Sequence, residues 1–298
     1  MQSLWMLLAC AMFAMMGACI KVAADFGASL SQIVLFRGVP SVVLLAAWAI
    51  GTGRTLRPPS WKLHLWRNLS GVSAMWLSFY ALSNLPLPTA ISLNYTSPLF
   101  ITGWMMVSGA SRRDRVRSLA VILGFLGVVG ILRPSIGQEH FLAGLLGLCG
   151  GCLAAVAMLQ VRQLGRLGEP EWRTVLIFSS CVCATSVVGL SAQGWDVPSL
   201  PAWLGLVGLG ASGMVGQLAM TRAFGHGSTL LTAALQYTTI IFAAMLGIVF
   251  WGDRPDSLAW AGMALIIGSG LLSTWRTYTE SRKRRAADRP NGGAARAA

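Results

Sequence analysis

The stretch NYTSPLF at residues 94–100 decides the fold, because it returns in altered form as QYTTIIF at residues 236–242. The two stretches lie 142 positions apart. The same shift, with short gaps elsewhere, also brings Pro59 and Trp61 onto Pro201 and Trp203, Ser70-Gly71 onto Ser212-Gly213, and Cys10 onto Cys152. Identity between the halves is low, but the apolar segments keep the same register. Weak internal symmetry of this kind predicts a chain built from two related repeats.

The composition is that of a chain surrounded by lipid. Its 298 residues are 55% hydrophobic and only 11% charged, whereas an average soluble domain carries about 25% charged residues. Apolar runs of about 20 residues, which can cross a hydrocarbon core of about 30 Å, alternate with short polar breaks. No run alternates with a period of two, so we predict an all-α integral membrane protein and not a β-barrel. Ten transmembrane helices are expected at residues 4–24, 30–50, 67–86, 88–109, 117–133, 141–161, 172–192, 202–222, 228–250 and 256–275.

Charge placement predicts the orientation of these helices. The net charge is +13, and most of the 23 Lys and Arg residues fall in alternate connections and in the C-terminal tail. Basic residues mark the cytoplasmic side of a membrane protein, so both termini are expected in the cytoplasm. No Lys or Arg precedes Lys21, so the first apolar run is interpreted as a retained span and not as a cleaved signal peptide. The basic tail is expected to face anionic lipid, and no nucleic-acid partner is expected.

Five spans per repeat is an odd number, so the second repeat has to enter the membrane in the opposite orientation. The expected units are a first repeat at 3–133, a second at 142–276, and a basic, disordered cytoplasmic tail at 277–298. Inverted repeats are related by a pseudo-two-fold axis in the membrane plane. Folds of this kind bind a solute near the midplane, between the repeats, and expose it to each side in turn.

Several stretches resemble the ten-helix EamA-type branch of the drug/metabolite transporter superfamily. They cover nearly the whole chain up to about residue 276. One departure from the family pattern is the absence of a Glu after the fourth and ninth spans, where this chain has Asp114 and Gly252-Asp253. The matching positions are Lys21, Phe36-Arg37, residues 94–100, Gly124-Phe125-x-Gly127-Val128, Arg133-Pro134, residues 221–224, Gln236-Tyr237, Gly262, Ile266-Ile267 and Ser269-Gly270.

The resemblance implies a central cavity lined by the first, third, fourth, sixth, eighth and ninth spans. Polar groups at membrane depth face the bundle interior or a wet cavity. The best candidates for binding a substrate are therefore the repeat mates Asn94-Tyr95 and Gln236-Tyr237, which would face each other across the axis. The alternative is that they form hydrogen bonds between helices. Pro98 is expected to break its helix locally and free carbonyl groups nearby.

Three further residues complete the predicted substrate-binding set. Trp76 could form an aromatic cavity wall with Phe79 and Phe13, and Gln217 is a deep polar residue in the eighth span. Arg37, the one basic residue well inside a span, would attract an anionic or zwitterionic solute, form a structural ion pair with Asp25, or extend its side chain to the interface.

Enzymatic and metal-binding interpretations find little support. Cys149-x-x-Cys152 lies in an apolar helix with no second pair, and we interpret it as small packing residues. Gly210-Ala211-Ser212-Gly213 resembles a serine-protease motif, but its Ser-Gly core is the repeat mate of Ser70-Gly71. We therefore expect no catalytic residues, no metal and no cofactor, and we interpret these glycines as sites of close helix packing.

The sequence also limits how transport could be coupled to an energy source. There is no nucleotide-binding G-x-x-x-x-G-K-[ST] motif, and no carboxylate falls deep in a span. Transport is therefore expected to depend little on an imposed pH gradient, which leaves facilitated diffusion, exchange, or coupling through surface carboxylates.

The leading interpretation is a secondary transporter of the bacterial inner membrane that exports a small organic metabolite by alternating access. An opine-like metallophore or an amino-acid derivative is one solute class that this interpretation allows, and the sequence does not identify the solute. The alternative is an uptake permease for a vitamin, a nucleoside or an S-adenosylmethionine-like solute. A membrane-embedded enzyme is a remote third class. The expected partners are the solute and the lipid bilayer, and a second copy of the chain is carried as a candidate partner.

Overall fold

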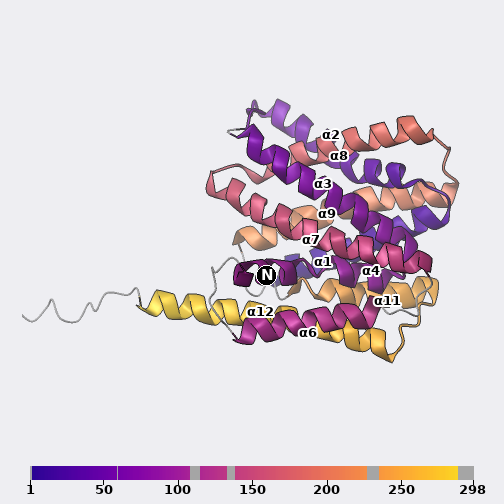
Figure 1. The fold of residues 1–298 in the computed structure, drawn as a ribbon. Helices are drawn as coiled ribbons and strands as arrows, with labels where there is room; N and C mark the ends of the chain where they lie inside the picture. Colours follow the sequence, from indigo (N-terminus) through magenta and orange to yellow (C-terminus); the bar gives the residue numbers. More distant parts are fainter. Residues whose placement is uncertain (1, 59, 108–114, 133–137, 227–234, 288–298) are drawn as a thin grey trace, which may run out of the picture.

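Figure 1 shows a computed structural model of the chain as a bundle of helices. It describes all residues except 1, 59, 108–114, 133–137, 227–234 and 288–298. In the described residues every element of regular secondary structure is an α-helix. The helices are α1 (Gln2–Asp25), α2 (Leu30–Gly51), α3 (Trp61–Asn84), α4 (Leu87–Asn94), α5 (Ser97–Val107), α6 (Arg115–Leu132), α7 (Gln138–Arg166), α8 (Glu171–Gln193), α9 (Leu200–His226), α11 (Thr238–Trp251) and α12 (Ser257–Ala287).

The length and surface of these helices fit a membrane. Six of them are long and apolar enough to cross a bilayer. Large apolar side chains point outwards on several helices; Val188, Val249 and Phe250 are about two-thirds or more exposed. Such a surface would be costly in water and is suited to lipid. The prediction of an all-helical integral membrane protein is confirmed for the described residues.

The predicted fourth span is divided into two helices. α4 ends at Asn94 and α5 begins at Ser97, with a turn in which the amide of Thr96 donates to the carbonyl of Leu93 at 3.2 Å. Pro98 explains the break, since it has no N–H and its ring would clash with the carbonyl of Asn94 in a continuous helix. A second break occurs at the repeat mate, because Leu235 is helical and Gln236 and Tyr237 form a turn before α11. No proline marks that second break.

The helices pack in pairs that mirror one another. α1 packs along α9, and α3 packs along α7. α2 packs against α8, and α6 packs against α12 at the lower edge of the view in Figure 1. In the centre, α11 contacts α1 and α4, while α7 contacts α4 and α5. The two broken segments therefore lie between the long helices of the bundle.

Glycines make the closest of these approaches possible. A Cβ atom at Gly205 of α9 would lie 2.9 Å from the carbonyl oxygen of Cys19 in α1. On α6, a Cβ at Gly127 would lie 2.6 Å from the carbonyl oxygen of Gly262. The hydroxyl of Ser212 donates to the carbonyl of Gly208 in its own helix at 2.6 Å. The interpretation of this glycine-rich stretch as helix packing is confirmed.

The two ends of the bundle are named here by their connections. The α2–α3 end holds the connections α2–α3 and α7–α8, and the α1–α2 end holds α1–α2, α8–α9 and α11–α12. The C-terminal part of α12 (yellow) extends past the other helices in Figure 1. α12 continues to Ala287, so the first part of the predicted tail is helical, and residues 288–298 lie outside the described residues.

Candidate functional site

The two tyrosines that the repeat singles out meet at the centre of the bundle. Tyr95 lies in the break between α4 and α5, and Tyr237 is the N-cap residue of α11. Their ring centroids are 6.4 Å apart, with an angle of 55° between the rings. The hydroxyl of Tyr95 donates to Oγ1 of Thr239 at 3.0 Å, and Thr239 is fully buried. A hydrogen bond thus links the first broken segment to the second.

Tyr237 differs from Tyr95 in its surroundings. It is only 4% exposed, and its hydroxyl finds no hydrogen-bond partner among the described residues. Its ring lies directly on Gly270 of α12, where any Cβ atom would overlap the ring carbon Cζ and the hydroxyl oxygen. A buried hydroxyl without a partner costs free energy, so this oxygen is an unsatisfied polar atom at the centre of the bundle.

Asn94 and Gln236 flank the tyrosines on opposite sides of the centre. Oδ1 of Asn94 accepts a hydrogen bond from the hydroxyl of Ser78 on α3 at 3.2 Å. Beside Gln236, the thiol of Cys10 on α1 donates to the carbonyl of Leu235 at 3.2 Å. Both side chains are half-buried. Each is the chain neighbour of one tyrosine, and the contacts at the two positions are made with different long helices, α3 at Asn94 and α1 beside Gln236.

Trp76 lies toward α8, because its Nε1 donates to Oγ1 of Thr185 at 3.2 Å. It also lies close to Gly189, where a Cβ atom would be 3.4 Å from the Trp76 ring. The structure therefore brings the tyrosines together at the break, and it places Trp76 at the contact between α3 and α8.

Arg37 and Gln217 belong to the region where α1, α2 and α9 meet. A Cβ atom at Gly213 would lie 2.9 Å from Nε of Arg37 and 2.9 Å from the sulfur of Met16. Gln217 is half-buried on α9, after Gly216, which packs against Phe13 and Met12 of α1. Asp25, the proposed partner of Arg37, instead accepts a hydrogen bond from Nε1 of Trp251 at 2.7 Å.

Two residues that contact the tyrosine pair, Thr239 and Gly270, were not among the predicted site residues. Thr239 occupies the place of Ser97 in the first repeat. Both repeats therefore carry a hydroxyl residue two positions after the tyrosine, and this signal was present in the sequence. Gly270 has no such signal, because its packing against Tyr237 arises only in the folded bundle. The described residues contain no group of three or more His, Cys, Asp or Glu side chains placed to hold a metal ion.

The EamA-like transporter family matches residues 1–133 and 141–275. The chain belongs to this family. The resemblance to EamA-type transporters is confirmed, and the chain is a multi-pass membrane transporter and not an enzyme.

Several characterised members of the family are similar along most of the chain. The pseudopaline exporter CntI of Pseudomonas aeruginosa is 28% identical over 256 residues, which is 86% of this chain and 89% of the relative. The riboflavin transporter of Vibrio cholerae is 26% identical and covers 95% of this chain and 96% of its own. The S-adenosylmethionine uptake transporter of Rickettsia bellii is 25% identical, with 81% and 82% covered.

A solved crystal structure shares the fold of this EamA-like transporter. It aligns with 94% of this chain and 98% of its own chain, at a TM-score of 0.64 and 19% identity. At that identity the likeness shows the fold alone.

The α1–α2 end of this EamA-like transporter is closed by contacts between its two matched segments. Nζ of Lys21 lies 4.0 Å from Oδ2 of Asp253 and 5.2 Å from the centre of the Trp251 ring. Nε2 of Gln32 donates to the carbonyl of Asp196 at 2.7 Å. The Asp at position 253, where many family members carry a Glu, thus provides a carboxylate near Lys21.

Proposed function

We propose that this EamA-like protein is a secondary transporter of the bacterial inner membrane that moves a small organic metabolite by alternating access. The observation that carries the proposal is the meeting of Tyr95 and Tyr237 between the two segments that match the family. Each tyrosine lies where a helix is interrupted, and irregular backbone at membrane depth is tolerated where it lines a site or is buried in protein.

The pairing of helices supports two inverted five-helix repeats with ten spans, at 3–133 and 142–276. Exchanging the two repeats converts the contact of α1 with α9 into that of α7 with α3. It leaves the contacts α2–α8 and α6–α12 unchanged. A two-fold relation is also supported by smaller contacts, because α1 reaches the carbonyl of Leu235 through Cys10, and α7 approaches the equivalent carbonyl of Leu93 at Gly151.

The binding centre that we propose is built around the tyrosine pair. Two aromatic rings and the partner-free hydroxyl of Tyr237 suit a planar or amphipathic solute that carries hydrogen-bonding groups. The other proposed members supply amide, indole and guanidinium groups from the surrounding helices. The full set is Tyr95, Tyr237, Asn94, Gln236, Gln217, Trp76 and Arg37.

Export is the direction that we favour, with an opine-like metallophore or an amino-acid derivative as the solute. The similarity to the pseudopaline exporter supports this choice. The alternative is uptake of a vitamin, a nucleoside or an S-adenosylmethionine-like solute, and the riboflavin and S-adenosylmethionine relatives support it. Both termini are proposed to lie in the cytoplasm, as the charge distribution predicts.

Transport by the full chain in proteoliposomes tests the function, with pseudopaline, riboflavin and S-adenosylmethionine as separate labelled solutes. Tyr237→Phe is the informative variant. It removes a hydroxyl that makes no hydrogen bond to the described residues, and it keeps the ring that packs on Gly270. We expect transport of the recognised solute to fall about tenfold, the loss of roughly one hydrogen bond to substrate.

Thr239→Val is the matched control, because it removes the acceptor of the Tyr95 hydrogen bond and leaves both tyrosine hydroxyls in place. A purely structural role for the pair predicts that Thr239→Val is damaging and that Tyr237→Phe is not. That result, or absence of transport for all three solutes, contradicts the proposal as stated.

A further inference from the structure

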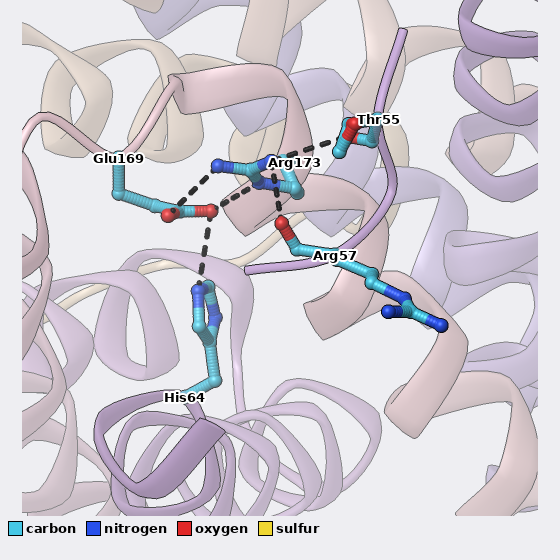
Figure 2. A network of polar contacts seen from close by, with 5 residues as sticks. All are labelled: Thr55, Arg57, His64, Glu169 and Arg173. Carbon is cyan, nitrogen blue, oxygen red and sulfur yellow. Dashed lines mark hydrogen bonds and ion pairs between the residues drawn. The ribbon is translucent and has the colours of Figure 1, made fainter. Parts of the chain in front are cut away.

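A buried carboxylate lies at the α2–α3 end, in the connection between α7 and α8. Glu169 follows Gly168, which turns the chain with a φ of 75°, and its side chain is fully buried. Arg173 of α8 binds it with two nitrogens, Nε to Oε1 at 2.5 Å and Nη2 to Oε2 at 3.1 Å (Figure 2). A two-nitrogen pair of this kind holds its geometry more firmly than a single contact.

The same guanidinium reaches across to the other matched segment. Nη1 of Arg173 donates to the carbonyl of Thr55 at 3.1 Å and to that of Arg57 at 2.8 Å. Both carbonyls belong to the connection between α2 and α3, and Figure 2 shows the side chain of Arg57 pointing away from the cluster. One side chain therefore ties the α2–α3 connection to the α7–α8 connection.

His64, in the first turn of α3, completes the cluster. It is 1% exposed, and its Nε2 lies 3.3 Å from Oε1 of Glu169. Neither of its two ring nitrogens makes a hydrogen bond of good geometry among the described residues. We refer to Thr55, Arg57, His64, Glu169 and Arg173 together as the Arg173 latch (Figure 2).

The charges that face His64 come from three elements. Among the described side chains, Glu169 in the α7–α8 connection is the carboxylate that acts on His64, and Arg173 on α8 and Arg67 on α3 are the cations. Arg67 packs its guanidinium over the ring of Phe178 at 3.8 Å. A proton on His64 would therefore add a third positive charge around one carboxylate that Arg173 already engages, inside a site that excludes water.

Burial lowers the pKa of His64, which precedes the predicted third span, below its usual value of 6.5. Glu169 opposes this shift, and the two guanidiniums add to it. When the latch is closed, His64 therefore holds a proton less tightly than it would in contact with water. By linkage, acidification through about pH 6.5 favours the form in which His64 is released to water.

We propose that His64 and Glu169 form a proton-binding site that keeps the α2–α3 end closed while His64 is neutral and releases it when His64 takes up a proton. The proton is taken from solvent by the ring nitrogen that carries none. It enters and leaves on the same side of the membrane, so the pH of that side sets the opening without driving accumulation of a solute. The inference rests on the proposed alternating access, in which the two ends open in turn.

Spin labels in the two connections test the latch without any solute. Leu56 and Leu167 are both exposed, at 46% and 57%, and each lies in one of the connections that the latch joins. Cysteines replace them in the full chain, in a background where the six native cysteines are alanine, and the protein is placed in lipid nanodiscs. Distances between the labels are measured by pulsed electron paramagnetic resonance at pH 8 and at pH 5.

We expect one short distance at pH 8 and a second, longer population that grows at pH 5. His64→Gln should keep the short distance at both pH values, because glutamine cannot take up the proton. Glu169→Gln should show the longer population at pH 8 as well, because Arg173 loses its anionic partner. Labels at Phe26 and Val197, exposed residues of the α1–α2 end, serve as the control and should show no longer population at pH 5.

An unchanged distance between positions 56 and 167 from pH 8 to pH 5 overturns the proposal, and so does an identical shift in His64→Gln. Neither result bears on whether the protein carries a solute. Conversely, a pH-dependent distance in a protein that moves none of the three tested solutes would leave the latch in place and count against the proposed function.

Discussion

The two ends of the bundle are tied by equivalent hydrogen bonds, made once with a neutral side chain and once with a charged one. Gln32 is the third residue of α2 after its N-cap Ser29, and it donates to the carbonyl of Asp196. Arg173 is the third residue of α8 after its N-cap Pro170, and it donates to the carbonyl of Thr55. A shift of 141 residues superimposes both donors, both caps and both acceptors.

The difference lies in what surrounds each donor. Gln32 also closes a capping box with Ser29, an arrangement denied to α8 because Pro170 has no N–H to be capped. At the shift of 141, Ala28 of the α1–α2 end takes the position of Glu169. At the shift of 142 that holds from Pro59 onward, Leu206 takes the position of His64. Both residues are buried. The two repeats thus make the same hydrogen bond at both ends. Only at the α2–α3 end do a Glu and a His surround the donor.

Removing Glu169 should disturb this comparison most. Glu169→Ala introduces the residue of the other end but leaves the guanidinium of Arg173 buried without its anion, at a cost of about 3–5 kcal/mol. Thermal unfolding in detergent can be followed by the reaction of a fluorogenic thiol probe with buried Cys10, in a background where the other five cysteines are alanine. Asp196→Ala is the control, since the side chain of Asp196 is exposed and its bond to Gln32 uses the backbone. Equal losses of stability in Glu169→Ala and Asp196→Ala would contradict the burial of the Glu169–Arg173 pair.

Copying the neutral donor and the neighbouring alanine of the α1–α2 end should restore much of that loss. In Glu169→Ala combined with Arg173→Gln, the buried cation is gone and a glutamine at the same helix position can still reach the carbonyl of Thr55. We expect the double variant to be more stable than Glu169→Ala alone by about 2 kcal/mol. A double-mutant cycle with Arg173→Gln gives the coupling energy. Strictly additive losses would show that the two side chains act independently.

Removing the neutral donor should have a smaller effect. Gln32→Ala loses the bond to Asp196 and one half of the capping box, at about 1 kcal/mol. Because both hydrogen bonds of Gln32 are made with uncharged groups, the loss should be the same at pH 5 and at pH 8. The same thermal assay at both pH values checks it, and a loss confined to one pH would break the contrast between the ends.

The pH dependence of stability should distinguish the ends by the smallest margin. The pKa of His64 is lowered in the folded protein, so its contribution is complete above pH 6.5 and declines as the pH falls below that value. His64→Gln should therefore flatten the slope of melting temperature against pH between 7 and 5. Lys62→Gln, an exposed basic position of the same helix turn, is the control and should keep the slope of the parent. If the melting temperature of His64→Gln still falls with pH as in the parent, another titratable group causes the pH dependence.

The sequence was most informative where the two repeats agree. The equivalence of Tyr95 and Tyr237 predicted that they would face each other, and their rings do lie 6.4 Å apart. Pro98 predicted the break before α5 from backbone chemistry alone. The break at Tyr237 has no such residue, and only its position as repeat mate pointed to it.

The latch was not predicted, for a physical reason. Glu169 follows a glycine in a polar connection, which is the pattern of an exposed loop residue, and its burial depends on Arg173 and on the distant His64. Pairings across more than a hundred residues leave no local periodicity. Arg37 shows the same limit, because Asp25 was a reasonable partner in sequence but bonds to Trp251 in the structure.

The contact between Tyr237 and Gly270 joins the proposed binding centre to the backbone of α12. A ring that lies directly on a helix backbone cannot move toward it without pushing that helix aside. α12 has 31 residues and is about 46 Å long, so it passes well beyond a hydrocarbon core of about 30 Å. A displacement of the Tyr237 ring toward Gly270 would therefore have to move a helix that is longer than the hydrocarbon core is thick. If a bound solute displaces Tyr237, a fluorophore on the C-terminal part of α12 would report that binding while leaving every residue of the proposed centre unlabelled.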